Sequence, residues 1–148
     1  MGKNSFIYAD NAATTAVLPE ILNAMLPYFT EQYGNASSPY APGRQAKAAL
    51  ENARAQLGEC LGAAKREIYF TSGGTESNNW ALRSVLTAKR AEGKNHVIVS
   101  AVEHPSILKT AQAWADEGGL LTLLPVGQDG LVNPEDLRAA ICPATALV

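Results

Sequence analysis

Two adjacent glycines and a threonine, Gly73-Gly74-Thr75, form the part of this sequence best suited to holding an anion. An apolar run over 68–70 precedes them, and the residues after them follow a helical pattern. We expect a strand, a glycine turn and a helix start, where the backbone is open to close approach and free N–H groups point at the anion. Thr75 is predicted to be the N-cap, and its hydroxyl can also bond a phosphate oxygen. The spacing matches neither a P-loop nor the dinucleotide-binding glycine motif, so a plain capped turn is the alternative.

A histidine, His104, is the second candidate, because it follows an apolar run and stands directly before Pro105. We expect strands over 68–71 and 96–99, with the glycine turn after the first and Glu103-His104 after the second. Ligands in open α/β sheets bind outside the carboxyl ends of the strands, so the two motifs are predicted to converge on one rim of the sheet. Taken alone, a histidine at such a junction is more often a helix cap or a surface residue.

Four segments, in chain order, carry a resemblance to a known family. They are Tyr8-Ala9-Asp10-Asn11-Ala12-Ala13-Thr14-Thr15, then Tyr33-Gly34-Asn35-Ala36-Ser37-Ser38 with Gly43-Arg44 after it, then Thr71-Ser72-Gly73-Gly74-Thr75-Glu76, and Ser100-Ala101-Val102-Glu103-His104-Pro105-Ser106. Together they closely resemble the NifS-like cysteine desulfurases, which are pyridoxal-phosphate (PLP) enzymes of the class V aminotransferase superfamily. The resemblance runs from about Tyr8 to Val148 and implies part of the α/β large domain of PLP-transferase fold type I.

The resemblance implies a role at each matching position. Gly74 and Thr75 match the residues that hold the phosphate of pyridoxal 5'-phosphate, and His104 matches the histidine that stacks on the pyridine ring and assists proton transfer. The segment Asn11-Ala12-Ala13 matches the loop that lines the substrate side. Tyr40 stands where the family often has a histidine, which affects the subgroup and not the family.

The implied activity is that of a cysteine desulfurase. Such an enzyme moves sulfur from L-cysteine to an enzyme persulfide, releases L-alanine, and supplies iron–sulfur cluster assembly or thiolation. The implied partners are a sulfur-acceptor protein and a second copy in a homodimer. Two alternatives stay open: a selenocysteine lyase or other class V PLP enzyme, and a non-catalytic remnant that only binds a phosphate ligand or a protein.

Several residues that complete such an enzyme have no match in this chain. A PLP transferase needs a lysine that holds the cofactor covalently, and the family's Ser-x-His-Lys segment is absent. Its Asn-Asn-Glu segment, its aspartate for the pyridine nitrogen and its persulfide-carrying cysteine are also absent, since neither Cys60 nor Cys142 matches. A further strand is expected from residue 144. We therefore expect the N-terminal portion of a longer enzyme, inactive by itself, whose missing C-terminal portion is a partner.

Composition and charge limit the classes to which this protein can belong. With 148 residues, 47% of them hydrophobic, the chain can bury a core. A formal net charge of −2 without a Lys/Arg cluster argues against nucleic acid and anionic membranes as partners. No apolar run is long enough to span a bilayer, and residues 1–6 lack the apolar region of a secretion signal, so a cytoplasmic location is expected. The two cysteines lack the spacing of a metal site or a disulfide framework.

Alternating strand and helix patterns predict a mostly parallel sheet with crossover helices. Helices are expected over 19–30, 44–61, 76–90, 105–117 and a short stretch capped by Asn133, and strands over 68–71, 96–99, 120–126 and from 144. Residues 1–15 are expected to line the substrate side, and 16–148 to form the N-terminal part of the PLP-binding large domain. Packing positions are predicted for Cys60, Trp80 and Trp114, and exposure for His96.

Overall fold

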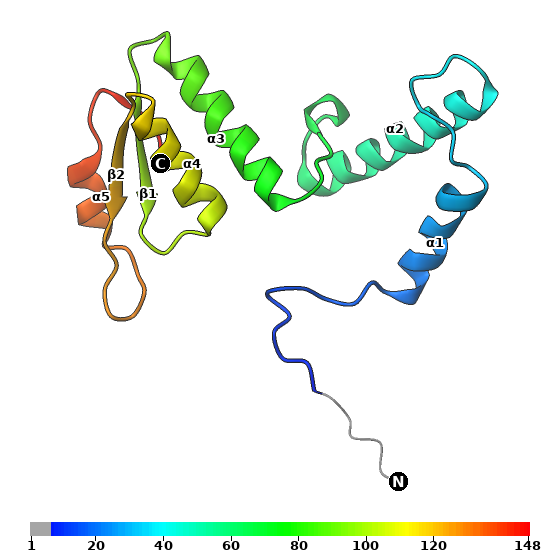
Figure 1. Cartoon of the computed structure of the whole chain (residues 1–148), viewed down its shortest axis with the longest axis horizontal. Coiled ribbons are helices and arrows are strands. Elements are labelled where there is room, and N and C mark those ends of the chain that lie inside the picture. Colours follow the sequence, from blue (N-terminus) through cyan, green and yellow to red (C-terminus); the bar gives the residue numbers. More distant parts are fainter. Residues whose placement is uncertain (1–6) are drawn as a thin grey trace. The chain divides into compact units, whose positions relative to one another are not determined.

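The structure, a computed structural model, describes residues 7–148 (Figure 1), so the expectation about a secretion signal at residues 1–6 lies outside it. The chain forms two compact units, Met1–Tyr69 and Phe70–Val148. The division between residues 1–15 and 16–148 stays a prediction.

The N-terminal unit is helical. Helix α1 spans Pro19–Thr30 as predicted, and α2 spans Ala41–Leu61, starting at Ala41 rather than at residue 44. The earlier start is possible because Pro42 falls in the first turn, where a missing N–H removes no intrahelical bond. Gly62 ends α2 with a φ of +67°, a left-handed conformation that favours glycine. A short 3-10 helix, η1 (Lys65–Glu67), follows.

This unit has almost no core. Helix α1 buries no residue, and α2 buries only Gly43 and Gly58. The prediction that Cys60 packs in a core is therefore wrong, because its thiol-bearing side chain is exposed. Helical periodicity places the residue on an apolar stripe, but burial also needs a facing element, and the described part of this unit has no sheet.

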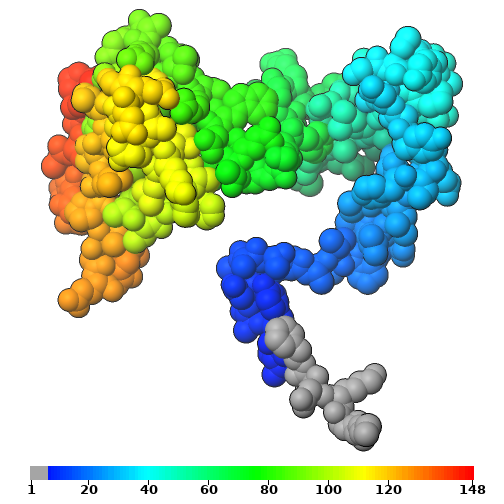
Figure 2. Space-filling view, viewed as in Figure 1, coloured from blue at the N-terminus to red at the C-terminus, as the bar shows by residue number. Residues whose placement is uncertain are grey.

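The C-terminal unit is α/β and contains the sheet. Its elements are α3 (Gly74–Arg90), β1 (His96–Ser100), α4 (Pro105–Asp116), β2 (Leu120–Leu124), α5 (Pro134–Ala140) and β3 (Thr145–Leu147). The strand order is β2-β1-β3 and both pairings are parallel, which confirms the predicted fold class. Helices α3 and α4 lie on one side of the sheet and α5 on the other (Figure 1). The loop between β2 and α5 projects from the unit as an orange lobe (Figure 2).

The core lies between the sheet and the pair α3–α4. Alternation along β1 turns Val97 and Val99 toward the helices, where they meet Leu86 of α3 and Trp114 of α4. Trp114 is 3% exposed, and its indole N–H donates to the Asn95 carbonyl at 2.9 Å. Packing of Trp114 is thus confirmed.

Three predictions fail in this unit or at its start. Trp80 is 49% exposed, because it lies off the face of α3 that Leu82 and Leu86 bury. Residues 68–71 form no strand: the sheet of the described chain consists of β2, β1 and β3, and an apolar run does not by itself specify a pairing partner. His96 is buried, not exposed, because β1 is the central strand and its first residue is flanked on both sides.

Candidate functional site

The anion-binding candidate lies at the start of α3. Gly73 is the N-cap in an extended conformation, and Gly74 and Thr75 are the first two helical residues. The prediction that Thr75 caps the helix is wrong: Thr75 lies two residues after the N-cap, and no side chain makes a capping hydrogen bond at this helix start. A Cβ added to Gly73 or Gly74 would meet nothing within 4 Å, so the backbone here is open to a ligand. The first N–H groups of α3 have no intrahelical partner and form the positive end of the helix dipole.

The side chains beside Thr75 hold this turn in shape. Glu76 accepts hydrogen bonds from the backbone N–H and the hydroxyl of Ser72, both at 2.7 Å. The first of these bonds, and then the second, lowers the pKa of the Glu76 carboxyl from its ordinary value of 4.5. Thr71 and Ser77 share a hydroxyl pair at 2.7 Å. Within the described residues the Thr75 hydroxyl has no hydrogen-bond partner, so it remains available to an anion.

His104 is the N-cap of α4. Its Nδ1 accepts a hydrogen bond from the backbone N–H of Ser106 at 3.1 Å. The Ser106 hydroxyl lies 2.8 Å from the same nitrogen. Both the capping and the ligand-facing interpretations of this histidine are compatible with the structure, because the cap uses Nδ1 and the exposed ring keeps a face and Nε2 free.

One pocket brings the two motifs together. A hollow of about 320 Å³ is lined by Gly74, Thr75, Asn78, His104 and Ser106. The predicted convergence of the glycine turn and the histidine is therefore confirmed, although the glycine turn follows an irregular segment and not a strand. No carboxylate lines this pocket, which suits an anionic ligand.

Two side-chain hydrogen bonds join α3 and α4 at the pocket. The Asn78 side-chain amide donates to the Ser106 hydroxyl at 2.9 Å, and the Thr110 hydroxyl donates to the side-chain amide oxygen of Asn79, Oδ1, at 2.7 Å. Ser106 and Thr110 are 7% and 4% exposed, so these bonds satisfy groups that water cannot reach. Sequence reasoning missed Asn78 and Ser106. The available signals were the Asn pair one turn into α3 and a serine two residues after a capping histidine.

A wider groove of about 410 Å³ continues from the pocket along α3 and α4. It adds two cations, Arg83 and Lys109, to the shared residues Thr75, His104 and Ser106. Arg83 pairs with Glu117 at 3.1 Å, and both side chains are about half exposed. Since Glu117 offsets the charge of Arg83, Lys109 is the cation that adds positive charge to the groove.

The predicted substrate-side segment lies in the other unit. Asn11-Ala12-Ala13 forms an exposed turn in which the Ala13 N–H donates to the Asp10 carbonyl at 3.1 Å. Its role beside the pocket stays a prediction.

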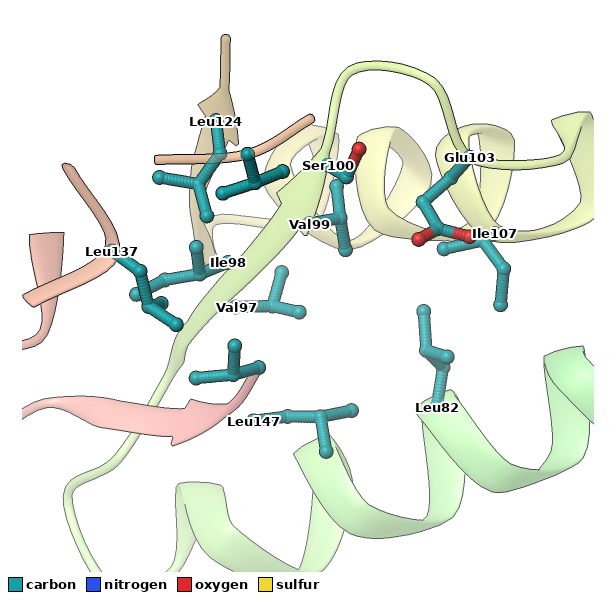
Figure 3. Close-up of a pocket in the computed structure, with 12 residues that line it drawn as sticks. Leu82, Val97, Ile98, Val99, Ser100, Glu103, Ile107, Leu124, Leu137 and Leu147 are labelled. Atoms are coloured by element: carbon teal, nitrogen blue, oxygen red, sulfur yellow. The ribbon is translucent and has the colours of Figure 1, made fainter. Parts of the chain in front are cut away.

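A second cavity, of about 390 Å³, is mainly apolar (Figure 3). It opens where β3 ends, alongside β1, and Glu103 is the one charged residue among those described that line it. The pairing of β1 with β3 covers His96 and Val97 only, so beyond Val97 this edge of β1 has no strand partner in the described chain.

Comparisons with known proteins show the family to which the chain belongs. The sequence profile of the aminotransferase class-V family matches residues 7–148. A cysteine desulfurase IscS of Methanosarcina thermophila is 48% identical over 147 residues, which are 99% of this chain and 36% of that protein. A NifS/IcsS protein homolog of Lactobacillus delbrueckii subsp. bulgaricus is 46% identical, over 96% of this chain and 37% of that protein.

Solved structures give the same result. A NifS-like protein superposes with a TM-score of 0.86 at 34% identity, covering 92% of this chain and 37% of that one. The structure of SspA in complex with cysteine superposes with a TM-score of 0.84 at 36% identity, covering 93% and 40%.

The chain thus spans little more than a third of the length of the curated relatives it matches. None of the helices among residues 7–148 is both long and apolar enough to cross a membrane. The resemblance to NifS-like cysteine desulfurases, drawn from Gly74, Thr75 and His104 among others, is confirmed by the match over nearly the whole chain. On this evidence the chain belongs to the aminotransferase class V family.

Proposed function

We propose that this chain forms the phosphate-binding and ring-binding part of a PLP-dependent cysteine desulfurase. The observation that carries the proposal is the shared pocket of Gly74, Thr75 and His104. An open glycine backbone at a helix start, an unpartnered hydroxyl and an exposed imidazole are the groups that an aromatic phosphate ester needs. The residues therefore fit the cofactor.

Each of these residues has a distinct task in the proposed site. The N–H groups of Gly74 and Thr75 and the Thr75 hydroxyl bind the phosphate. His104 lines the same pocket, where its ring would stack on the pyridine and its Nε2 would hold or move a proton. When bound, PLP supplies an electron sink for bond cleavage at the amino acid substrate.

The proposed reaction moves sulfur from L-cysteine to an enzyme cysteine and leaves L-alanine. We propose a homodimeric, cytoplasmic enzyme that passes the sulfur to an acceptor protein for iron–sulfur assembly or thiolation. The names of the relatives, cysteine desulfurase IscS among them, support this choice within the class V family. Asn11-Ala12-Ala13 is proposed to line the substrate side.

The 148-residue chain is expected to be inactive by itself. None of its lysines, Lys3, Lys47, Lys65, Lys89, Lys94 and Lys109, lies in a Ser-x-His-Lys segment. Covalent cofactor binding and persulfide formation need groups that this sequence does not match.

A chimera tests the proposal. The chain replaces the matching portion of the Methanosarcina thermophila IscS, which is 48% identical to it. The chimera is expected to release alanine from L-cysteine in the presence of PLP, and the 148-residue chain is not. A folded chimera that binds PLP but releases no alanine would contradict a desulfurase, and a chimera that binds no PLP would favour a non-catalytic binding domain.

A further inference from the structure

In the described part of the chain, the hydrogen bonds to the His104 ring reach one of its two nitrogens, Nδ1. A backbone N–H can donate but not accept, so the bond from the Ser106 N–H to Nδ1 requires that Nδ1 carry no proton. The neutral ring therefore carries its proton on Nε2. This tautomer follows from the direction of one hydrogen bond and needs no assumption about a ligand.

The Ser106 hydroxyl adds a second contact to the same nitrogen. Its oxygen lies 2.8 Å from Nδ1 and also accepts the amide N–H of Asn78 at 2.9 Å. With Nδ1 unprotonated, the hydroxyl proton points to the ring. With the proton on Nδ1, the hydroxyl would have to turn its own proton away from the ring and accept a second N–H beside that of Asn78. The hydroxyl bond therefore adds to the bond from the backbone N–H in favouring the tautomer with its proton on Nε2.

Burial protects the Ser106 hydroxyl from competition by water. Ser106 is 7% exposed while the His104 ring is exposed, so water competes for the ring but not for the serine. Asn78 belongs to α3, the helix whose start carries the anion-binding turn. The hydrogen bonds Asn78–Ser106–His104 therefore tie the orientation of the ring to the helix that presents Gly74 and Thr75.

We propose that Ser106 is a positioning residue, which orients the His104 ring beside the pocket and keeps the proton of the neutral ring on Nε2. This inference rests on the proposed function for its catalytic meaning. The tautomer and the ring orientation can be measured without any cofactor.

The experiment uses the 148-residue chain labelled with ¹⁵N only at histidine. The sequence has two histidines, His96 and His104, so few ring signals appear, and His104→Ala identifies those of His104. Ring ¹⁵N shifts are recorded in solution, or by magic-angle spinning if the chain self-associates. We expect an unprotonated Nδ1 and a protonated Nε2 for His104 in the neutral ring.

Ser106→Ala is expected to lower the Nε2–H to Nδ1–H tautomer ratio on the order of 5-fold, the effect of one lost hydrogen bond. Ser106→Thr, which keeps the hydroxyl, is expected to restore it. Thr110→Val is the control, because it removes the bonds of the Thr110 hydroxyl to the Asn79 side-chain amide oxygen and to the Ser106 backbone carbonyl while leaving the Ser106 hydroxyl and the His104 ring in place.

Three outcomes would overturn the inference. They are a wild-type ring that averages between tautomers, an unchanged ratio in Ser106→Ala, and an equal change in Thr110→Val. Should Ser106→Ala unfold the chain, Asn78→Ala replaces it, and an unchanged ratio there counts against the inference as well. Failure to bind pyridoxine 5′-phosphate, with the tautomer as described, would sink the proposed function and leave the positioning role of Ser106 intact.

Discussion

The two units contain similar fractions of apolar residues but bury them to different extents. Helix α1 carries Leu22, Leu26 and Phe29, which are 46%, 47% and 68% exposed. In the C-terminal unit, Leu86 and Val97 are fully buried. The difference lies in what faces each helix: α3 and α4 pack on a sheet, while the described part of the N-terminal unit contains none.

This difference separates helix formation from helix burial. Proline placement, periodicity and the left-handed Gly62 are enough to form α1 and α2 without a core. A core requires a second layer against which the apolar stripe can pack. The C-terminal unit, in which helices pack on a sheet, also contains the pocket of Gly74 and His104. Only elements fixed by such packing can keep these two residues at a constant separation.

The largest effect expected is on stability. Leu86→Ala should cost about 2–5 kcal/mol of unfolding free energy, because it opens a cavity under α3. Leu26→Ala in α1 should cost less than about 1 kcal/mol, since half of that side chain is already in water. Urea unfolding of the two variants measures both values. Equal losses would show that the N-terminal unit has a core comparable with that of the C-terminal unit.

The next effect concerns the chemical step. His104→Ala in the IscS chimera should lower turnover on the order of 100-fold while PLP stays bound, since the ring is one of several anchors. Tyr40→His, in the N-terminal unit, should change turnover little because it affects a subgroup feature. Alanine release and the PLP absorbance are followed together. Near-normal turnover of the His104 variant would reduce this residue to a helix cap.

A smaller effect separates cofactor binding from substrate binding. Thr75→Ala should weaken PLP retention of the chimera on the order of 10-fold, the loss of one charge-assisted hydrogen bond. Its thermal stability should hardly move, because the Thr75 hydroxyl caps nothing. Asn11→Ala in the N-terminal unit should raise the KM for L-cysteine instead. If Thr75→Ala leaves PLP affinity intact, the hydroxyl is not a phosphate ligand.

The smallest effect is a difference in salt dependence between two carboxyls. Arg54 holds the pKa of Glu51 low in α2, whereas the backbone N–H of Ser72, then its hydroxyl, lowers that of Glu76 in α3. Raising the ionic strength should bring the pKa of Glu51 closer to 4.5 and leave that of Glu76 in place, because salt screens ion pairs at the surface more than neutral hydrogen bonds.

The sign of the linkage is the same for both carboxyls. A lowered folded pKa contributes stability that is present above the ordinary value of 4.5 and is lost as the pH falls through the folded value. Carboxyl ¹³C titrations at low and high salt measure both groups. A Glu76 pKa that rises with salt as much as that of Glu51 would assign it an ion-pair partner.

Much of the fold follows from local sequence signals. The bounds of α1, the left-handed Gly62 and the Asn133 cap of α5 are all set by nearby residues, and the parallel sheet follows from alternation. The failures at His96, Trp80 and residues 68–71 share a cause. Each depends on which strand or helix lies alongside, and periodicity along one segment does not encode its neighbours.

The site shows the same division. Gly74, Thr75 and His104 could be selected from their types and spacing. The roles proposed for them come from the family resemblance. The links through Asn78 and Ser106 were not predictable, because they depend on the distance between α3 and α4.

The central claim is that the pocket of Gly74, Thr75 and His104 binds the phosphate ester of PLP. The most direct measurement is the amide ¹H–¹⁵N shift change of the 148-residue chain on titration with pyridoxine 5′-phosphate, which cannot react with lysines, and with pyridoxine as control. The amides of Gly74 and Thr75 should move with the phosphate ester and stay in place with pyridoxine. Unmoved amides at both positions, or equal movement with pyridoxine, would contradict the account.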